Sequence, residues 1–230
     1  MKDRHVVVLT GAGISAESGL GTFRGSGGLW EGVSVQEVAT PEAWQRNREK
    51  VLRFYNQRRA EIRKAEPNEA HQALRALEEM FRVTIVTQNI DDLHERAGST
   101  NVLHLHGEIM KSRSSRDEQL LYDCTGDIQV GDRCEKGAQL RPHVVWFGES
   151  VPMMEQAIKV AGTADFFIVV GTSLEVYPAA SLIEYVPYEI PKFFVDPLPN
   201  GLTDESFHVV QAPATTGVPS VVTQLRALMA

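Results

Sequence analysis

The chain has 230 residues, of which 43% are hydrophobic, and its formal net charge is −7. This length suits one domain, or one domain with a large insertion, and the apolar share can fill a core. The acidic balance argues against nucleic-acid binding, and we expect no membrane span, no signal peptide and no disulfide framework. We therefore expect a cytoplasmic protein that binds neither nucleic acid nor membranes. A monomer is our expectation for its oligomeric state.

The first patterned stretch covers residues 5–24. An apolar run over residues 6–9 predicts a buried strand, which turns at Gly11-Ala12-Gly13 into a helix-competent segment. The glycine spacing fits the dinucleotide-binding turn, in which backbone N–H groups and the helix end face a phosphate. An ordinary tight turn of an α/β protein has the same spacing, so this motif alone leaves both interpretations open.

A glycine-rich loop follows, where a Rossmann unit would continue into a second strand ending in an acidic residue for the ribose. The loop carries one aromatic residue, Phe23, and one arginine, Arg24. Its composition indicates a lid over a bound ligand.

Two helices are predicted next. Thr40-Pro41 is typical of a helix start, and this helix runs, with or without a break, to about residue 66. Its many basic side chains mostly form a solvated surface. Asn68 caps the second helix, whose apolar residues recur at helical spacing to residue 81.

Polar side chains follow the strand predicted over residues 83–86. Gln88, Asn89 and Asp91 come directly after the carboxyl end of this strand, where ligands bind in open α/β sheets. A polar loop with an aspartate helix cap would give the same pattern, so the spacing alone favours neither interpretation.

Two histidines, His104 and His106, alternate along the next short strand and share one face if the strand is regular. A single histidine is usually structural. His106 precedes Gly107 at the strand end, where side chains reach solvent or ligand, so His106 is the better candidate for acid–base chemistry near neutral pH.

The second half begins with a change of character. Residues 108–142 are polar, poorly periodic and contain both cysteines, which indicates an inserted lobe. Apolar runs then predict strands over residues 166–170 and 192–195, a last strand near 208–211, and a closing helix over 218–228. Strands that alternate with helices predict a parallel sheet covered on both faces.

Five motifs, taken in chain order, resemble the sirtuin family of NAD-dependent protein deacylases over essentially the whole chain. They are Gly11-Ala12-Gly13-Ile14-Ser15 with Phe23-Arg24-Gly25, Thr87-Gln88-Asn89-Ile90-Asp91, His106-Gly107, Phe147-Gly148-Glu149 and Gly171-Thr172-Ser173. Each motif is weak alone, but five in this order are not expected by chance.

The resemblance implies an α/β fold with a Rossmann-like parallel sheet, and a small inserted domain that combines a degenerate zinc-ribbon-like region with a helical module. The Rossmann-like NAD-binding domain would comprise residues 1–34, 67–107 and 143–230. The small domain would comprise residues 35–66 and 108–142.

The resemblance also implies a set of site residues. Those expected to bind NAD are Gly11, Ala12, Gly13, Ser15, Phe23, Arg24, Gln88, Asn89, Ile90, Asp91, Gly171, Thr172, Ser173, Asp196 and Ala214. Those expected to pair with an extended substrate peptide by strand addition are Val144, Val145, Trp146, Phe147, Gly148 and Glu149. His106 would be the general base, and Asn89 a second catalytic residue.

The implied chemistry consumes NAD. Its N-glycosidic bond breaks, the amide oxygen of an acyl-lysine attacks the ribose carbon, and the products are lysine, nicotinamide and O-acyl-ADP-ribose. An imidazole that titrates near neutrality is suited to take a proton from the ribose diol. Neutral amides such as Asn89 and Gln88 can orient ribose and water without quenching the developing positive charge.

Tyr55 and Arg58 lie three residues apart on a predicted helix, so their side chains project to one side. They could belong to the basic surface of that helix. Desuccinylase-type sirtuins of bacteria and mitochondria carry a similar Tyr-x-x-Arg, and a phenol with a guanidinium suits a distal carboxylate. The resemblance therefore implies activity on succinyl- and malonyl-lysine, with acetyl-lysine as a second substrate.

The chain departs from the family at two places. Most sirtuins bind a structural zinc through four cysteines, but this chain has only Cys124 and Cys134, and Ser114 stands where another is expected. We expect no zinc and no metal ligand, with a weak or shared site as the alternative. Asp196 stands where many relatives have Asn and Glu, and its carboxylate could still bind ribose hydroxyls.

Three other functions use parts of the same pattern. A dehydrogenase fits the first glycine turn, but the missing second strand argues against it. A non-catalytic module for NAD or ADP-ribose would not need His106 and Asn89, so the presence of both residues argues against it. A mono-ADP-ribosyltransferase would cleave the same glycosidic bond and differ only in the acceptor.

Overall fold

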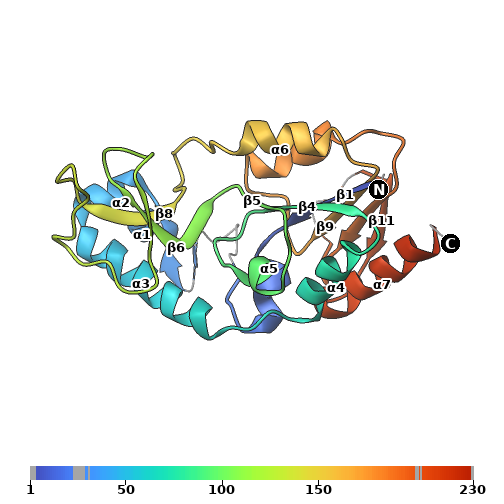
Figure 1. Ribbon diagram of the computed structural model, residues 1–230, viewed down its shortest axis with the longest axis horizontal. Helices are drawn as coiled ribbons and strands as arrows, with labels where there is room; N and C mark the ends of the chain where they lie inside the picture. The colour runs from blue at the N-terminus through green and yellow to red at the C-terminus, as the bar shows by residue number, and fades with distance from the viewer. Residues whose placement is uncertain (1–3, 23–28, 31, 200–201, 203, 229–230) are drawn as a thin grey trace.

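The computed structural model describes residues 4–22, 29–30, 32–199, 202 and 204–228. A parallel sheet with flanking helices lies at one end of the molecule, and a smaller lobe lies at the other (Figure 1). The loop residues Phe23 and Arg24 lie outside the described residues.

The large sheet has six strands in the order β11-β10-β9-β1-β4-β5. Their bounds are His5–Thr10 (β1), Arg82–Thr87 (β4), Val102–His104 (β5), Phe166–Val170 (β9), Lys192–Val195 (β10) and Phe207–Val210 (β11). All neighbouring pairs are parallel, which confirms the predicted Rossmann-like sheet. The chain builds one half of the sheet from β1, β4 and β5 and the other half from β9, β10 and β11, so the strand order switches between β1 and β9.

Alternate residues of β1 pack into different cores. Val6 and Val8 contact a cluster that contains α4 (Glu69–Leu77) and α7 (Ala214–Ala227). Val7 and Leu9 contact the cluster on the opposite face, with α6 (Met154–Ala161) and the 3-10 helix η3 (Ala179–Tyr185). Figure 1 shows α6 on one side of the sheet and α4 and α7 on the other. Burial on both faces explains why this strand is continuously apolar.

The lobe contains an antiparallel sheet in the order β7-β6-β8, which the sequence did not predict. Its strands are Gly107–Ser114 (β6), Leu121–Asp123 (β7) and Leu140–Val144 (β8). Its helices are Val35–Val38 (α1), Pro41–Arg46 (α2) and Arg48–Lys64 (α3), beside the short pair Leu29–Trp30 (β2) and Val33–Ser34 (β3). One apolar cluster joins these helices to β6 and β8.

Local capping explains two details of the helices. Thr40 accepts a hydrogen bond from the N–H of Ala43, and Asn47 accepts one from the N–H of Lys50, so the predicted helix is broken between α2 and α3. The segment after β1 is the 3-10 helix η1 (Ala12–Ser18), and α5 is Leu93–Arg96. Within the described part of the chain, no helix is long and apolar enough to cross a membrane.

Candidate active site

The site lies at the switch in strand order, beyond the carboxyl ends of β1 and β9. One cavity of about 800 Å³ opens there and extends to the lobe segment 144–149. Every predicted site residue that the structure describes lines this cavity. A switch point is where open α/β sheets bind ligands, because the flanking loops diverge from it.

The first glycine turn packs directly against the turn after β9. The N–H of Gly11 donates to the Val170 carbonyl at 3.0 Å, and the N–H of Gly13 donates to the Gly171 carbonyl at 2.8 Å. A Cβ atom on Gly13 would lie 2.6 Å from the Cα of Gly171. The expectation that these N–H groups face a phosphate is therefore wrong for Gly11 and Gly13, whose glycines allow close backbone approach.

A chain of buried hydrogen bonds joins this turn to the loop after β4. The Asn89 amide donates to the Ser15 hydroxyl at 3.2 Å, and that hydroxyl donates to Asp91 at 3.1 Å. Burial raises the pKa of Asp91, while bonds from the Leu93 N–H and Ser15 oppose the rise. Gln88 donates from its amide to the Thr172 hydroxyl at 3.1 Å. The predicted polar cluster is thus held in place from both sides of the switch point.

His106 lines the cavity with a defined tautomer. Its Nδ1 lies 2.9 Å from the Gln88 carbonyl, which can only accept, so Nδ1 carries the hydrogen and Nε2 keeps its lone pair. Burial lowers the pKa of His106, and the Gln88 carbonyl opposes that shift. The imidazole is therefore neutral near pH 7 and chemically able to accept a proton.

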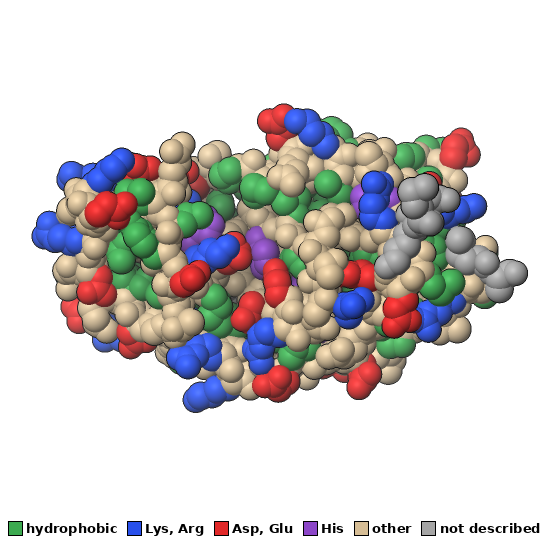
Figure 2. Space-filling view, viewed as in Figure 1, with side chains coloured by type: hydrophobic (Ala, Val, Ile, Leu, Met, Phe, Trp, Pro, Cys, Tyr) green, Lys and Arg blue, Asp and Glu red, His purple; other side chains and the backbone are tan. Residues whose placement is uncertain are grey.

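His104 makes a different set of contacts. Its Nδ1 lies 3.0 Å from the Asn89 carbonyl and its Nε2 lies 2.8 Å from Glu95. Burial lowers the pKa of His104, but the bond and charge of Glu95 outweigh burial and raise it overall. On the face of the molecule shown in Figure 2, charged and histidine side chains gather between the lobe and the large sheet. Through the contacts of its two ring nitrogens, His104 ties the Asn89 loop to Glu95 of α5.

Tyr55 and Arg58 project from α3 into the cavity, and both are buried. The Tyr55 hydroxyl accepts a hydrogen bond from the Trp146 indole at 3.0 Å, and burial raises the pKa of Tyr55, so the phenol keeps its proton. Arg58 lies 3.3 Å from the half-exposed carboxylate of Glu61. This burial excludes the alternative that the pair belongs to the solvated surface of the helix.

The predicted peptide-binding segment 144–149 already uses several backbone donors. The N–H of Val145 donates to the His106 backbone carbonyl, and the N–H of Phe147 donates to the Ala39 carbonyl. The N–H of Trp146 donates to the Glu149 carboxylate at 2.8 Å. These three N–H groups are not available to an added strand. Fewer backbone donors of segment 144–149 than the sequence predicts can therefore bind a substrate peptide.

The far end of the cavity is formed by the end of β10 and the start of α7. Asp196 accepts a hydrogen bond from the N–H of Leu198, and burial raises its pKa. Ala214 is buried at the first residue of α7. Sequence reasoning missed Glu17, which lines the cavity and accepts hydrogen bonds from the N–H and hydroxyl of Thr215. It lies in η1 just after the first glycine motif, and that proximity was the available signal.

The lobe cysteines do not converge with other ligands. The Cys134 thiol lies 3.4 Å from the Ser114 hydroxyl, and the Cys124 thiol lies 3.4 Å from the Gly126 carbonyl. Among the described residues, no three His, Cys, Asp or Glu side chains are grouped so that they could hold a metal ion. This donor set does not fit a tetrahedral zinc site.

The parallel sheet, the switch-point cavity and the neutral histidine define an α/β protein with a ligand site equipped for acid–base chemistry. Comparison with known families then gives the particular group: the Sir2 family profile matches residues 11–178. The chain belongs to the Sir2 family, which confirms the resemblance to sirtuins.

Individual relatives agree with this assignment. The chain is 54% identical over 194 residues to an NAD-dependent protein deacylase of Aggregatibacter actinomycetemcomitans, covering 84% of this chain and 93% of that protein. It is 48% identical over 222 residues to one of Bacteroides thetaiotaomicron, covering 94% and 95%. Among solved structures, a Sir2 homologue with ADP-ribose has a TM-score of 0.90 at 38% identity, covering 98% of this chain and 93% of that one. A Sir2 homologue–NAD complex has a TM-score of 0.87 at 38% identity, covering 98% and 91%.

Proposed function

We propose that the chain is an NAD-dependent protein-lysine deacylase that acts on succinyl- and malonyl-lysine, with acetyl-lysine as a second substrate. The enzyme class is that of its curated Sir2-family relatives, which are named NAD-dependent protein deacylases. The products would be the free lysine, nicotinamide and O-acyl-ADP-ribose.

The observation that carries the acyl preference is the burial of Tyr55 and Arg58 in one cavity wall. A guanidinium fork and a phenol hydroxyl in the same wall can both donate hydrogen bonds to one acceptor. A carboxylate at the end of a short acyl chain is a matching partner, because it can accept from both groups. The methyl group of an acetyl chain gains nothing from either.

The residues at the switch point fit a bound NAD molecule in their chemistry. When bound, NAD supplies the glycosidic bond that breaks. The buried Asp91 and the amides of Gln88 and Asn89 can hydrogen-bond the carboxamide and ribose. His106 Nε2 can take a proton from a ribose hydroxyl, because its other nitrogen donates to Gln88.

The decisive experiment incubates the protein with NAD and matched peptides that carry succinyl-, malonyl- or acetyl-lysine, and follows nicotinamide together with peptide mass. We expect a mass loss equal to the acyl group. Arg58→Met should lower activity on succinyl-lysine at least about tenfold more than on acetyl-lysine, since it removes a charged hydrogen bond.

The exposed Arg53 on the same helix offers a matched control, and Arg53→Met should leave the succinyl-to-acetyl ratio unchanged. Equal losses on both peptides in Arg58→Met would refute the acyl preference. A peptide that gains the mass of ADP-ribose would instead identify the protein as an ADP-ribosyltransferase.

We also infer that the lobe folds without structural zinc. Ser114, in place of a thiolate, accepts hydrogen bonds from the N–H groups of Arg116 and Asp117 at 3.3 Å, as well as from Cys134. A salt bridge of 2.7 Å between Lys136 and Asp117 ties the same turns together. These contacts support a lobe that is held by hydrogen bonds and ion pairs.

A further inference from the structure

We propose that Arg141 is a positioning residue for acyl selectivity, acting through Trp146 on the hydroxyl of Tyr55. Arg141 belongs to β8 and does not line the cavity, whereas Trp146 and Tyr55 do. The inference rests on the proposed role of the Tyr55–Arg58 wall and adds the group that sets the geometry of that wall.

The first step is the stacking of Arg141 on the indole. The Arg141 guanidinium carbon lies 3.3 Å from the centroid of the Trp146 ring, and both side chains are buried. The ring of Trp44 packs nearby, with its centroid 5.7 Å from that of Trp146. A desolvated cation over an indole face is attracted by the ring quadrupole, so Arg141 helps to fix the plane of the ring.

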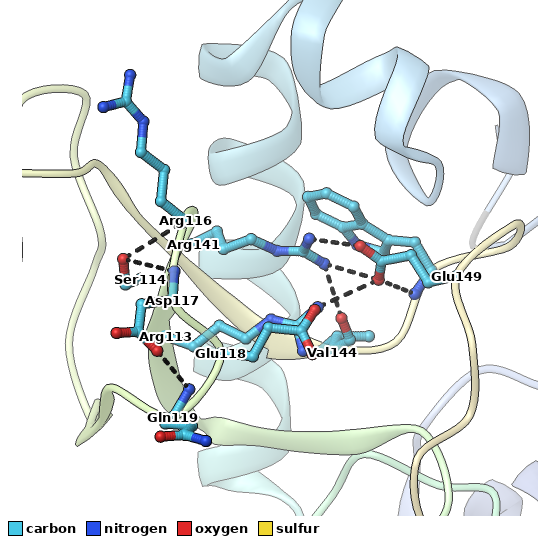
Figure 3. A network of polar contacts seen from close by, with 10 residues as sticks. Arg113, Ser114, Arg116, Asp117, Glu118, Gln119, Arg141, Val144 and Glu149 are labelled. Atoms are coloured by element: carbon cyan, nitrogen blue, oxygen red, sulfur yellow. Dashed lines mark hydrogen bonds and ion pairs between the residues drawn. The ribbon is translucent and has the colours of Figure 1, made fainter.

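The second step is the anchoring of the guanidinium itself. Arg141 donates to both oxygens of Glu149, at 2.6 and 3.1 Å, and to the Val144 carbonyl at 2.8 Å. Glu149 also accepts from Arg113 at 3.3 Å and from the N–H of Trp146. Figure 3 shows Arg141 and Arg113 pointing from the lobe strands toward Glu149. A bidentate pair of this kind restricts the orientation of Arg141 as well as its position.

The third step is the bond from the indole to the phenol. The Trp146 Nε1–H donates to the Tyr55 hydroxyl at 3.0 Å. Because a lone pair of that oxygen receives the indole hydrogen, the hydroxyl hydrogen is directed away from Trp146. A fixed indole therefore fixes the direction in which Tyr55 can donate to a substrate carboxylate.

The charge of Arg141 cannot replace that of Arg58 at the acyl chain. Arg141 is paired with Glu149, and the Trp146 ring lies over its guanidinium. Because Arg141 does not line the cavity, it influences a substrate carboxylate through the groups that do, the Trp146 indole and the Tyr55 hydroxyl. This arrangement predicts that Arg141 affects carboxylated acyl chains and spares NAD binding.

The test compares Arg141→Met, Arg141→Lys, Trp146→Phe and Tyr55→Phe with wild type, using kcat/KM for succinyl- and acetyl-lysine peptides and KM for NAD. Arg141→Met should lower the succinyl-to-acetyl ratio about tenfold, as expected for a misdirected hydrogen bond to a charged group, with KM for NAD unchanged. Arg141→Lys should keep part of the succinyl-to-acetyl ratio that Arg141→Met loses. Tyr55→Phe combined with Arg141→Met should lose little more than Tyr55→Phe alone.

The matched control is Glu118→Gln, because Glu118 is exposed and lies 3.8 Å from Arg113 at the edge of the same network. This variant should keep the wild-type ratio. If Arg141→Met lowers both activities equally, or adds its full loss to Tyr55→Phe, Arg141 has only a structural role and the proposal is overturned.

A second measurement does not depend on activity. With 15N-labelled tryptophan, the indole N–H of Trp146, assigned with Trp146→Phe, should exchange slowly in wild type and at least about tenfold faster in Arg141→Met and in Tyr55→Phe. If the indole exchange rate is unchanged in Arg141→Met, the proposal is overturned, even where this variant has lost activity. A wild type that does not prefer succinyl-lysine would refute the proposed acyl specificity, while the exchange rates would still decide whether Arg141 holds Trp146.

Discussion

Two histidines only two residues apart have opposite electrostatic environments. His106 meets the Gln88 carbonyl, but burial dominates and lowers its pKa. His104 meets Glu95 as well, and that carboxylate raises its pKa despite burial. A neutral imidazole can act as a base, whereas a protonated one can hold two acceptors, so one residue suits catalysis and the other suits support of the Asn89 loop.

We expect His106→Ala to abolish deacylation while ADP-ribose binding, measured by calorimetry, stays within about threefold of wild type. General-base catalysis contributes 10²–10⁴-fold in typical enzymes, so the loss should be at least about a hundredfold. In wild type, kcat/KM should fall on the acid side with a midpoint below pH 6.5, because His106 must lose its proton and burial lowers its pKa.

The exposed His208 supplies the control for this prediction, since His208→Ala should leave both activity and the pH profile unchanged. An active His106→Ala enzyme, or an acid limb centred above pH 6.5, would contradict the assignment of the base.

At the scale of elements, the contact between η1 and the end of β9 shapes the switch point. The turns at Gly13 and Gly171 approach so closely that neither has room for a side chain. Gly171 also has a φ of +61°, which favours glycine. These glycines shape the cavity because they let the two backbone turns pack directly on each other. This packing is a structural reason for the glycine motif, which is usually explained by contact with a ligand.

We expect Gly13→Ala to destabilise the protein by about 1–3 kcal/mol, as overpacking does, because its Cβ would lie 2.6 Å from backbone atoms of Gly171. The midpoint of urea unfolding gives the change in unfolding free energy. Gly126→Ala is the matched control, since a Cβ there meets nothing within 4 Å. Equal stability of the two variants would show that the turns can separate without cost.

Helices α4 and α5 meet through a pair of buried histidines. The rings of His71 and His94 lie 4.9 Å apart, and the Nε2 of His94 lies 3.1 Å from the Thr10 hydroxyl. The Nδ1 of His71 accepts the N–H of Asn68 and completes the cap of α4. Burial lowers the pKa of His71 to about 4, and burial together with His71 and His104 lowers that of His94.

This pair should make the fold sensitive to acid. The pKa of His71 is lower in the folded state than its ordinary value of 6.5, so the unfolded chain binds the proton first. Stability is therefore complete above pH 6.5 and falls as the pH drops from 6.5 toward 4, by about 3 kcal/mol from His71. His71→Gln should flatten the dependence of the urea midpoint on pH in this window, whereas His208→Gln should not. Parallel curves for all three proteins would exclude His71 as the source.

At the scale of the whole molecule, the sequence predicted the sheet domain better than the lobe. The β1 strand was recognisable because burial on both faces demands a continuous apolar run. The β6 strand was not recognisable, because its sequence does not alternate between apolar and polar residues. One of its buried residues is the charged Arg113, which forms an ion pair with Glu149. Short strands with buried charges carry no periodic signal.

Some parts of the candidate site could be predicted from the sequence and others could not. Glycine turns and strand-end residues such as His106 form short local motifs, and the structure gathers them into one cavity. The bond between Tyr55 and Trp146 joins residues 91 positions apart, and the stacking of Arg141 on that indole depends on the lobe sheet. Such contacts are set by tertiary packing, so no local pattern predicts them.

The lobe gives the last prediction, because its stability must come from its own contacts if zinc is absent. Arg59 of α3 donates to the Ile109 carbonyl of β6 at 2.8 Å, and Arg113 and Arg141 bind Glu149. These buried charged bonds join the helices, the lobe sheet and segment 144–149, which is the work that a structural metal does elsewhere.

Elemental analysis of the purified protein should therefore find far less than one zinc per chain, and a strong chelator should leave the melting temperature unchanged. Cys134→Ser should cost no more than about 1 kcal/mol, because the new hydroxyl can still donate to Ser114. A thiolate ligand of structural zinc would cost several kcal/mol when removed, since metal binding contributes directly to folding. Stoichiometric zinc that the chelator removes with a fall in melting temperature would refute the prediction, and would mean that the lobe rearranges its cysteines around a metal.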